Sequence, residues 1–390
     1  MTTPKWIAKR EFNRRGMFAG TMDYDDALAL SIASLKEYGA RYPHWMLSYS
    51  GGKDSNALVS FVLWCIREKH IEAPETLTVM YADTRMELPP LHITAMQLLD
   101  IVKADGYNVR IIQPEMNKRF FVYMLGRGVP PPKNSMRWCT RILKAEPIKK
   151  AQDEIFAQYG GNVLNLTGVR KGESAARDER ISTSCSKHDG ECGQGWFQQA
   201  RNSLAPLMHW RVCWVWKWLY SDQQPYRVTQ DIAAVYAADD LEDIRTGCIA
   251  CHIVEEDRAL KYLVRKPGWQ HLAPLMELRG VYDWLMEPRQ RHRRVMPSLK
   301  KDGLYSDNAG ALGALTMAAR EEGLNRVLAL QAQTGYTLID AEEEAVIRGM
   351  WRDGVYPQGW TGAEPTGAEP YIKYVVRGGQ IVERQNMIGL

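Results

Sequence analysis

The chain has 390 residues, of which 45% are hydrophobic and 25% are charged, and its formal net charge is +4 at pH 7. These values are typical of a globular protein with one large domain, or with a core domain and an appendage. They do not require nucleic-acid binding, so any contact with nucleic acid must come from local patches.

No run of about 18 apolar residues occurs, which predicts that no segment crosses a membrane. Residues 1–15 are basic and lack the apolar stretch of a secretory signal, so we expect a cytoplasmic protein. The chain has 7 cysteines. In a cytoplasmic enzyme they favour metal-binding or catalytic thiols over disulfides.

The pattern of predicted elements divides the chain into three ranges. A helix is predicted over residues 23–39, with Asp23 as its N-cap, and it belongs to an N-terminal helical segment, residues 1–40. Strands and helices alternate over residues 41–265, which predicts an α/β domain. The pattern then changes to a mainly helical region with a basic loop, residues 266–390.

A glycine-rich turn lies between the first predicted strand, around residues 45–47, and a helix over about 56–69. A strand, a glycine turn and a helix together point backbone N–H groups at a phosphate. Glycine lets the backbone approach closely, lysine adds positive charge, and serine adds hydroxyl donors. The alternative is a turn without a ligand. The predicted phosphate loop consists of Ser50, Gly51, Gly52, Lys53, Asp54 and Ser55.

The second predicted strand, residues 77–82, ends at Asp83 and Thr84. In an open α/β sheet, ligands bind beyond the carboxyl ends of the strands. These two residues, with Glu87 shortly after them, are therefore candidate nucleotide contacts. The alternative is that Asp83 and Thr84 only cap the next helix, which is predicted over residues 90–104.

Cys139 lies among Arg137, Arg141 and Lys144. Nearby cations favour the thiolate, which is the form that binds metal or attacks sulfur, so Cys139 is a candidate catalytic or metal-binding residue. The alternative is a buried, inert cysteine. That is our interpretation of Cys65, which lies inside the apolar helix after the phosphate loop.

Gly168, Arg170 and Arg177 follow the fourth predicted strand, residues 163–167. Guanidinium groups at a strand tip suit phosphate or sulfate oxygens, and a solvated charged loop is the alternative. Four alternations of strand and helix predict a parallel sheet with helices on both faces.

The strongest metal signal is the pair Cys248 and Cys251, which are separated by two residues and preceded by a glycine. The spacing of Cys185, His188 and Cys192 suits zinc with one more ligand, or these residues belong to a mobile loop. Soft thiolates favour an iron–sulfur cluster or zinc, so several of these cysteines are candidate ligands of one centre.

The tryptophan-rich stretch over residues 206–219 predicts the start of an apolar helix that packs in the core, and a base-stacking platform is the alternative. Residues 289–301 are strongly basic, which makes them a candidate contact with a phosphate backbone, or else a solvated loop. Helices are also predicted over residues 272–286, 309–333 and 337–352, and a final hairpin around residues 371–383.

Together these motifs resemble those of the phosphoadenylyl-sulfate reductase-like ATP pyrophosphatases. The Ser-Gly-Gly-Lys-Asp-Ser loop is similar to their pyrophosphate loop, and Asp83 to Pro89 resembles their element after the second strand. Arg137 to Lys144, Gly168 to Arg177 and the Cys248–Cys251 pair are most similar in combination to the sulfurtransferase subunit of DNA phosphorothioation systems (DndC or SspD type). The resemblance covers roughly residues 40–260.

The resemblance implies an adenine nucleotide alpha hydrolase-like (PP-loop) fold that binds ATP and Mg²⁺. The catalytic residues that it implies are Lys53, Asp54, Arg170 and Cys139. The residues that it implies for nucleotide binding are the loop residues Ser50, Gly51, Gly52, Lys53, Asp54 and Ser55, together with Asp83, Thr84, Glu87, Gly168, Arg170 and Arg177.

An iron–sulfur cluster, of the 4Fe–4S type, is also implied, with Cys139, Cys248 and Cys251 as ligands. The family has a second cysteine where this chain has Thr140, and the further cysteine that usually follows the Cys248–Cys251 pair is absent. The fourth ligand is then Cys192, as we predict, or Cys185 or Cys213, or one iron stays open.

The implied activity is ATP-dependent sulfur transfer to DNA: a backbone phosphate is adenylated with release of pyrophosphate, and an oxygen is then replaced by sulfur. The implied partners are DNA, a cysteine desulfurase as sulfur donor, and the other phosphorothioation subunits of a restriction–modification defence system. Two rival activities are sulfonucleotide reduction, against which we count the lack of a cysteine near the C-terminal end, and tRNA thiolation. A non-enzymatic DNA-binding or assembly subunit is the remaining alternative.

Overall fold

The computed structural model describes residues 22–173, 178–179, 181, 190–191, 196–198, 202–236 and 247–388. The chain forms two compact units that interleave along the sequence, so they do not correspond one to one to the predicted ranges 1–40, 41–265 and 266–390, which stay predictions. The first unit comprises Met1–Asp83, Glu87–Gln113 and Glu146–Thr246, and the second comprises Thr84–Met86, Pro114–Ala145 and Gly247–Leu390.

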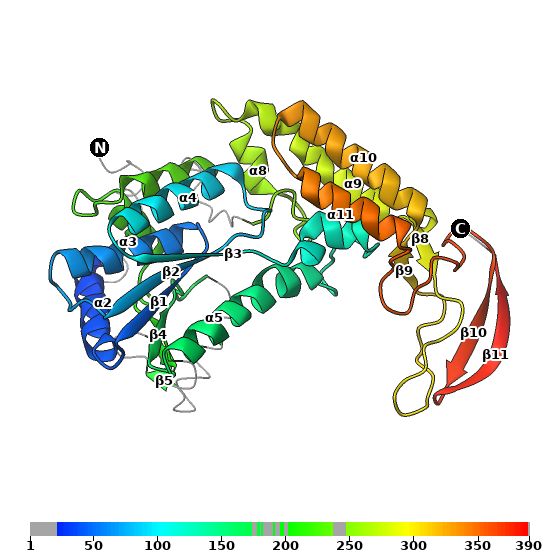
Figure 1. Ribbon diagram of the computed structural model, residues 1–390, viewed down its shortest axis with the longest axis horizontal. Helices are drawn as coiled ribbons and strands as arrows, with labels where there is room; N and C mark the ends of the chain where they lie inside the picture. The colour runs from blue at the N-terminus through cyan, green and yellow to red at the C-terminus, as the bar shows by residue number, and fades with distance from the viewer. Residues whose placement is uncertain are drawn as a thin grey trace. The chain divides into compact units, whose positions relative to one another are not determined.

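The first unit is built on a seven-stranded sheet in the order β3-β2-β1-β4-β7-β6-β5 (Figure 1). The pairs β1–β2, β2–β3, β1–β4 and β4–β7 are parallel, whereas β5–β6 and β6–β7 are antiparallel. The predicted α/β fold with a mostly parallel sheet is therefore confirmed. The strands are β1 (His44–Tyr49), β2 (Thr76–Ala82), β3 (Asn108–Ile112), β4 (Val163–Leu166), β5 (Gly190–Glu191), β6 (Trp196–Gln198) and β7 (Ser203–Ala205).

Helices connect the parallel strands of this unit. Helix α2 begins with the predicted cap: the Asp23 carboxylate accepts from the N–H of Asp26, and the Asp26 side chain accepts from the N–H of Asp23. Helix α4 begins at Pro89, where a missing N–H costs nothing. Among the described residues, the first unit has the helices α2 (Tyr24–Gly39), α3 (Lys53–Arg67), α4 (Pro89–Ala104), α5 (Glu146–Gln158), α7 (Val212–Leu219) and the 3-10 helix η5 (Arg227–Val235).

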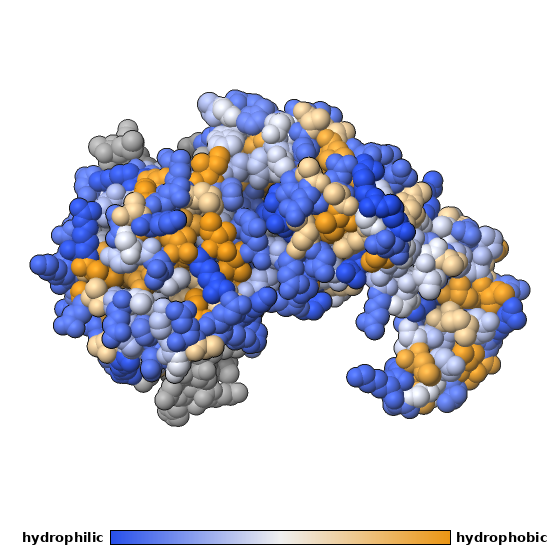
Figure 2. All heavy atoms as spheres, viewed as in Figure 1, coloured by the Kyte–Doolittle hydropathy of each residue, from blue (hydrophilic) through white to orange (hydrophobic). Residues whose placement is uncertain are grey.

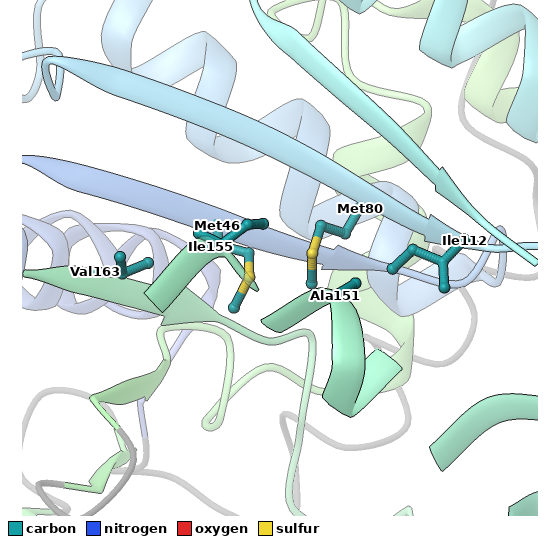
Figure 3. Close-up of a cluster of buried hydrophobic side chains, with 6 residues drawn as sticks. All are labelled: Met46, Met80, Ile112, Ala151, Ile155 and Val163. Atoms are coloured by element: carbon teal, nitrogen blue, oxygen red, sulfur yellow. The ribbon is translucent and has the colours of Figure 1, made fainter. Parts of the chain in front are cut away.

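Helix α5 covers one face of the sheet with a continuous apolar cluster (Figure 3). Because side chains alternate along a strand, Met46 points to α5, whereas its neighbours Trp45 and Leu47 point to the opposite face. Burial of this apolar surface is what holds the helix on the sheet. The cluster consists of Met46, Met80, Ile112, Ala151, Ile155 and Val163.

The tryptophan-rich stretch lies in the core of the first unit. Trp210 and Trp218 are fully buried, and each indole N–H donates to a serine hydroxyl at 2.9 Å, to Ser31 and Ser60 respectively. The core interpretation is therefore confirmed, and the base-stacking platform is wrong. The predicted helix begins later than expected, at Val212, because β7 and a turn precede it.

The second unit is mainly helical, with two small two-stranded sheets. The helix predicted over residues 309–333 begins only at Met317, because the residues before it pair with β8 as strand β9. The elements of the second unit are η1 (Met116–Lys118), η2 (Val122–Gly126), η3 (Thr140–Ala145), α8 (Arg258–Leu263), η6 (Gln270–Glu277), α9 (Leu278–Met286), η7 (Pro288–Gln290), β8 (Arg291–Arg293), β9 (Leu312–Leu315), α10 (Met317–Thr334), α11 (Ala341–Arg352), β10 (Tyr371–Arg377) and β11 (Gln380–Met387).

The hairpin of β10 and β11 ends the described chain. Its antiparallel register is interrupted by one irregularity after Val375. Figure 2 shows hydrophobic side chains among hydrophilic ones on this hairpin, and Val382 is 54% exposed. In the described part of the chain, no helix is both long and apolar enough to cross a membrane.

Candidate active site

The phosphate loop joins the end of β1 to the start of α3 in the first unit. Gly51 has a φ of 76°, which only glycine adopts without strain, and a Cβ there would lie 3.3 Å from the carbonyl oxygen of Leu91. Gly52 is the N-cap of α3 and provides no side-chain cap. The positive end of the helix dipole therefore faces the loop without a carboxylate or hydroxyl on the cap residue itself.

Asn56, which no sequence motif marked, fixes the shape of this loop. Its side chain is fully buried, and its amide donates to the carbonyl oxygens of Gly51 at 2.8 Å and of Gly52 at 3.1 Å. Its own carbonyl accepts from the Tyr49 hydroxyl at 3.0 Å. A buried amide with three hydrogen bonds holds the loop in one conformation, and its place in the helix, one residue after the motif, was the only signal of it.

Lys53 and Asp54 at the start of α3 form one buried network with Arg170, which follows β4. Nε of Arg170 donates to Oδ1 of Asp54, and the Lys53 ammonium lies 3.4 Å from Oδ2 of the same carboxylate. Burial alone would raise the pKa of Asp54, but Arg170 and Lys53 outweigh it and hold that pKa below its ordinary value. Asp54 is therefore an anion that orients two cations beside the loop.

Arg170 is 3% exposed and is fixed from several sides. Its guanidinium also donates to the carbonyl oxygen of Trp210 at 3.1 Å, and its backbone N–H donates to the Glu173 carboxylate at 3.1 Å. Gly168 is required here, because a Cβ would lie 2.9 Å from the carbonyl oxygen of Asp54. The predicted site residues Lys53, Asp54, Gly168 and Arg170 thus come together in the first unit.

Asp83 lies directly after β2, at the predicted strand tip. It is 5% exposed, accepts from Nε2 of Gln113 at 2.7 Å, and lies 4.0 Å from Nδ1 of His92. Helix α4 has Leu88 as its N-cap, so the alternative in which Asp83 and Thr84 cap that helix is wrong. The nucleotide role of Asp83 stays a prediction. Glu87, 8% exposed, belongs to the first unit, whereas Thr84 belongs to the second.

Tyr236 is a further residue of the loop that the sequence did not reveal. Its hydroxyl accepts from the backbone N–H of Lys53 at 3.2 Å, and the Lys53 ammonium lies 5.2 Å from the centre of its ring. No motif surrounds this tyrosine, and its contact with the loop spans 183 positions of the sequence.

The three thiols of the predicted cluster all belong to the second unit. Cys139, Cys248 and Cys251 are partly exposed and form no disulfide. Burial raises the pKa of Cys139, and the nearby Cys251 thiol adds to this in smaller part; an effect of its basic neighbours on the thiolate stays a prediction. Both Cys248 and Cys251 also raise the pKa of the buried Tyr282, after burial itself.

Cys139 and Cys251 lie near each other, and both Cys248 and Cys251 lie near Tyr282. Within the ranges that the structure describes, no three His, Cys, Asp or Glu side chains converge so that they could hold a metal ion. The donors are of the right chemical type for a cluster, and the cluster stays a prediction. Cys185, Cys192 and Arg177 lie outside the described residues. Cys65 and Cys213 are buried, as expected for packing residues.

The turn that carries Cys248 and Cys251 is held by neighbours that no motif predicted. Ala250 has a φ of 48°, and the carbonyl oxygen of Cys251 accepts from the Arg279 guanidinium. The ring nitrogens of His252 lie 2.8 Å from the carbonyl oxygen of Pro132 and 2.9 Å from the Asp283 carboxylate. These contacts fix the turn on the helices of the second unit.

The basic stretch after α9 differs from its prediction. Arg291 and Arg293 are only 7% and 8% exposed, and each donates two hydrogen bonds to backbone carbonyl oxygens of neighbouring segments. The predicted contact with a phosphate backbone is therefore wrong for these two residues. Arg289, Lys300 and Lys301 remain exposed.

Comparison with known proteins matches one family model to this region. Residues 44–229 match the model described as the phosphoadenosine phosphosulfate reductase domain. Two uncharacterised proteins of Methanocaldococcus jannaschii are each 28% identical to this chain, over 212 and 186 residues, which cover 54% and 47% of it. The matched regions are 36% and 38% of those proteins, so the chain spans little more than a third of the curated relatives it matches.

Two solved structures are also similar. Phosphoadenylyl-sulfate reductase from Candida auris, as a phosphate complex, matches with a TM-score of 0.34 and 14% identity, over 55% of this chain and 93% of that one. FMN adenylyltransferase from Candida glabrata, in complex with FMN and an ATP analogue, matches with a TM-score of 0.31 and 15% identity, over 52% and 61%. Residues 44–229, which hold the parallel strands of the sheet, are thus similar to the phosphoadenosine phosphosulfate reductase domain.

Proposed function

We propose that this chain is an ATP pyrophosphatase and sulfurtransferase that activates a DNA backbone phosphate and replaces one of its oxygens by sulfur. The observation that carries the proposal is the loop at the start of α3. It combines the N-terminus of α3 with Lys53, Arg170 and the Asp54 carboxylate that orients them. Such a site suits a leaving group with several negative charges, and pyrophosphate is that group when ATP is cleaved between the α- and β-phosphates.

The chemistry divides into two displacements. An oxygen of the DNA phosphate attacks the α-phosphorus of ATP, the bond to the β-phosphate oxygen breaks, and pyrophosphate leaves with the electron pair. Lys53, Arg170 and the backbone N–H groups of the loop stabilise its charge, with Mg²⁺ bound to the phosphates. The outer sulfur of a protein persulfide then attacks the DNA phosphorus and displaces AMP. A second thiol cleaves the S–S bond, so that a P–S bond replaces a P–O bond and a disulfide is left on the two thiols. Asp83 and Glu87 are proposed to contact the nucleotide.

The sulfur source is proposed to be a cysteine desulfurase that delivers sulfur to the thiols of the second unit. A 4Fe–4S cluster at Cys139, Cys248 and Cys251 is a separate proposal, with Cys192 as fourth ligand. The three thiols support it by their chemistry alone. Anaerobic purification followed by iron and sulfide analysis tests it: about four of each per chain are expected. Their absence from the wild-type chain would refute the cluster.

Sulfonucleotide reduction is the second candidate, and the family match favours it, because the matched model describes a phosphoadenosine phosphosulfate reductase domain. The same loop would then bind a sulfonucleotide, and sulfite would be the product. The two candidates differ in the bond that breaks. The first breaks a P–O bond of ATP, whereas the second breaks the S–O bond of a sulfonucleotide.

Two assays on the purified full chain separate these functions. Pyrophosphate release from ATP is expected with DNA present, and sulfite release from phosphoadenylyl sulfate in the presence of a thiol reductant is not. Arg170→Ala should lose most of the pyrophosphate release. Arg227→Ala is its matched control, since Arg227 is an exposed arginine of the same unit. Mass spectrometry of nucleotides from cells that express the chain with its partners should find sulfur in DNA. Sulfite release, or sulfur in tRNA alone, would refute the proposal.

A further inference from the structure

Tyr236 occupies the place where an anion would meet the start of α3. Its hydroxyl accepts from the backbone N–H of Lys53, the first residue of that helix. Backbone N–H groups at a helix start are the donors that bind phosphate oxygens. The hydroxyl also lies close to the glycines of the loop, since a Cβ on Gly52 would be 3.6 Å from it.

The ring of Tyr236 is held firmly in this position. It is 8% exposed and packs edge-on against Trp216 of α7, with ring centres 5.1 Å apart. The Lys53 ammonium lies over the Tyr236 ring, 5.2 Å from the ring centre, in a cation–π contact. The 3-10 helix η5 delivers it, and its backbone N–H donates back to Ala233 at 3.2 Å. The side chain is thus fixed beside the loop by packing and by charge.

A phenol hydroxyl both accepts and donates a hydrogen bond. An oxygen of a bound pyrophosphate group would replace it as the acceptor of the Lys53 N–H, because both need the same donor. The hydroxyl would then lie against that oxygen as a donor. Hydrogen bonds to charged groups are stronger than those between neutral groups, so the exchange favours binding.

We infer that Tyr236 is a binding residue of the phosphate site: its hydroxyl, which accepts from the first N–H of α3, donates a hydrogen bond to the β,γ-phosphate group of a bound nucleotide. This inference rests on the proposed function, because it takes ATP as the ligand of the loop. The inference adds a source of specificity to the proposed function, because Tyr236 would distinguish ligands that carry a pyrophosphate group from those that do not.

The test is calorimetric titration of the full chain and of Tyr236→Phe with ATP, inorganic pyrophosphate and AMP. Phenylalanine keeps the packing on Trp216 and removes only the hydroxyl. We expect Kd to rise about tenfold for ATP and for pyrophosphate, the size of one charge-assisted hydrogen bond, and to stay unchanged for AMP. Tyr220→Phe is the matched control, since Tyr220 also lies near Trp216, with ring centres 6.3 Å apart. It should leave all three affinities unchanged.

The outcomes separate this inference from the function on which it rests. If the wild-type chain binds neither ATP nor pyrophosphate, both are refuted. If it binds them and Tyr236→Phe binds them equally well or more tightly, only the role of Tyr236 is refuted. Equal weakening of AMP would also refute it, since that result marks a structural defect.

Discussion

Buried arginines occur in both units, and their partners differ. Arg170 in the first unit is bonded to the Asp54 carboxylate beside a helix start, with a lysine close by. Arg291, Arg293 and Arg320 in the second unit are bonded to backbone carbonyl oxygens. A carboxylate orients a cation toward a ligand site, whereas carbonyl partners fix a chain segment in place. The hydrogen-bond acceptor of a buried arginine therefore decides the role of that arginine, and the sequence does not specify the acceptor.

Replacing Arg170 should have the largest effect on activity. Arg170→Ala removes a donor to the leaving pyrophosphate, so we expect pyrophosphate release from ATP to fall by about 10²–10³-fold. It also leaves Asp54 buried without its main partner, which costs about 3–5 kcal/mol of folding free energy. Arg170→Lys keeps the charge and should recover much of the stability but little of the rate, because the forked geometry is lost. A steady-state assay together with urea unfolding measures both. Equal rates for Arg170→Ala and wild type would mean that Arg170 does not stabilise the leaving pyrophosphate.

Gly128→Ala should have the largest effect on the second unit. Gly128 has a φ of 83°, and a Cβ there would lie 2.2 Å from Nη2 of the buried Arg320. Arg320 stacks on Tyr356 at 3.9 Å, so it cannot move away without breaking that contact. Strain and overpacking together should cost about 2–5 kcal/mol, measured by urea unfolding.

Gly160→Ala is its matched control. Gly160 also has a positive φ, 61°, but a Cβ there meets nothing within 4 Å. It should therefore cost only the backbone strain, about 1 kcal/mol. The difference between the two variants measures what the packed arginine adds. Equal losses would mean that Arg320 gives way easily.

A smaller effect on stability should distinguish the buried Arg293 from the exposed Lys301 in the basic stretch. Arg293→Ala leaves two carbonyl oxygens without their donor, so we expect a loss of about 1–3 kcal/mol of folding free energy. Lys301→Ala is exposed and should change stability by less than about 0.5 kcal/mol. If this stretch contacts DNA, Lys301→Ala should lower the salt dependence of binding by about one phosphate contact. A loss of stability in Lys301→Ala would contradict the division.

Sequence reasoning predicted the frame of the first unit because local signals agree there. The alternating strands, the capped helix at Asp23 and the phosphate loop each follow from neighbouring residues, and Arg170 was placed at a strand tip by topology alone. Asn56 and Tyr236 escaped it for different reasons. Asn56 lies in an apolar helix without a motif, and Tyr236 reaches the loop from 183 positions away.

The second unit was harder to predict for a related reason. The charge of a basic stretch is visible in the sequence, but its direction is not, so Arg291 and Arg293 were expected to face a phosphate backbone. Strand pairing of β8 with β9 turns them inward to carbonyl oxygens.

The smallest expected effect is a dependence of stability on pH that comes from Asp54. Its pKa is lowered in the folded state, so its contribution is fully present above the unfolded pKa of about 3.9 and is lost as the pH falls through the folded value. The free energy of unfolding of wild type should exceed that of Asp54→Asn by a constant amount between about pH 5 and 7 and by a shrinking amount below about pH 4. Urea unfolding of both proteins over this range measures the difference. Asp153→Asn, at an exposed ion pair with Lys149, should show little change. If the difference in free energy of unfolding between wild type and Asp54→Asn instead grows in acid, Arg170 and Lys53 do not stabilise the Asp54 carboxylate. The contrast between Arg170 and the arginines of the second unit would then have no electrostatic basis.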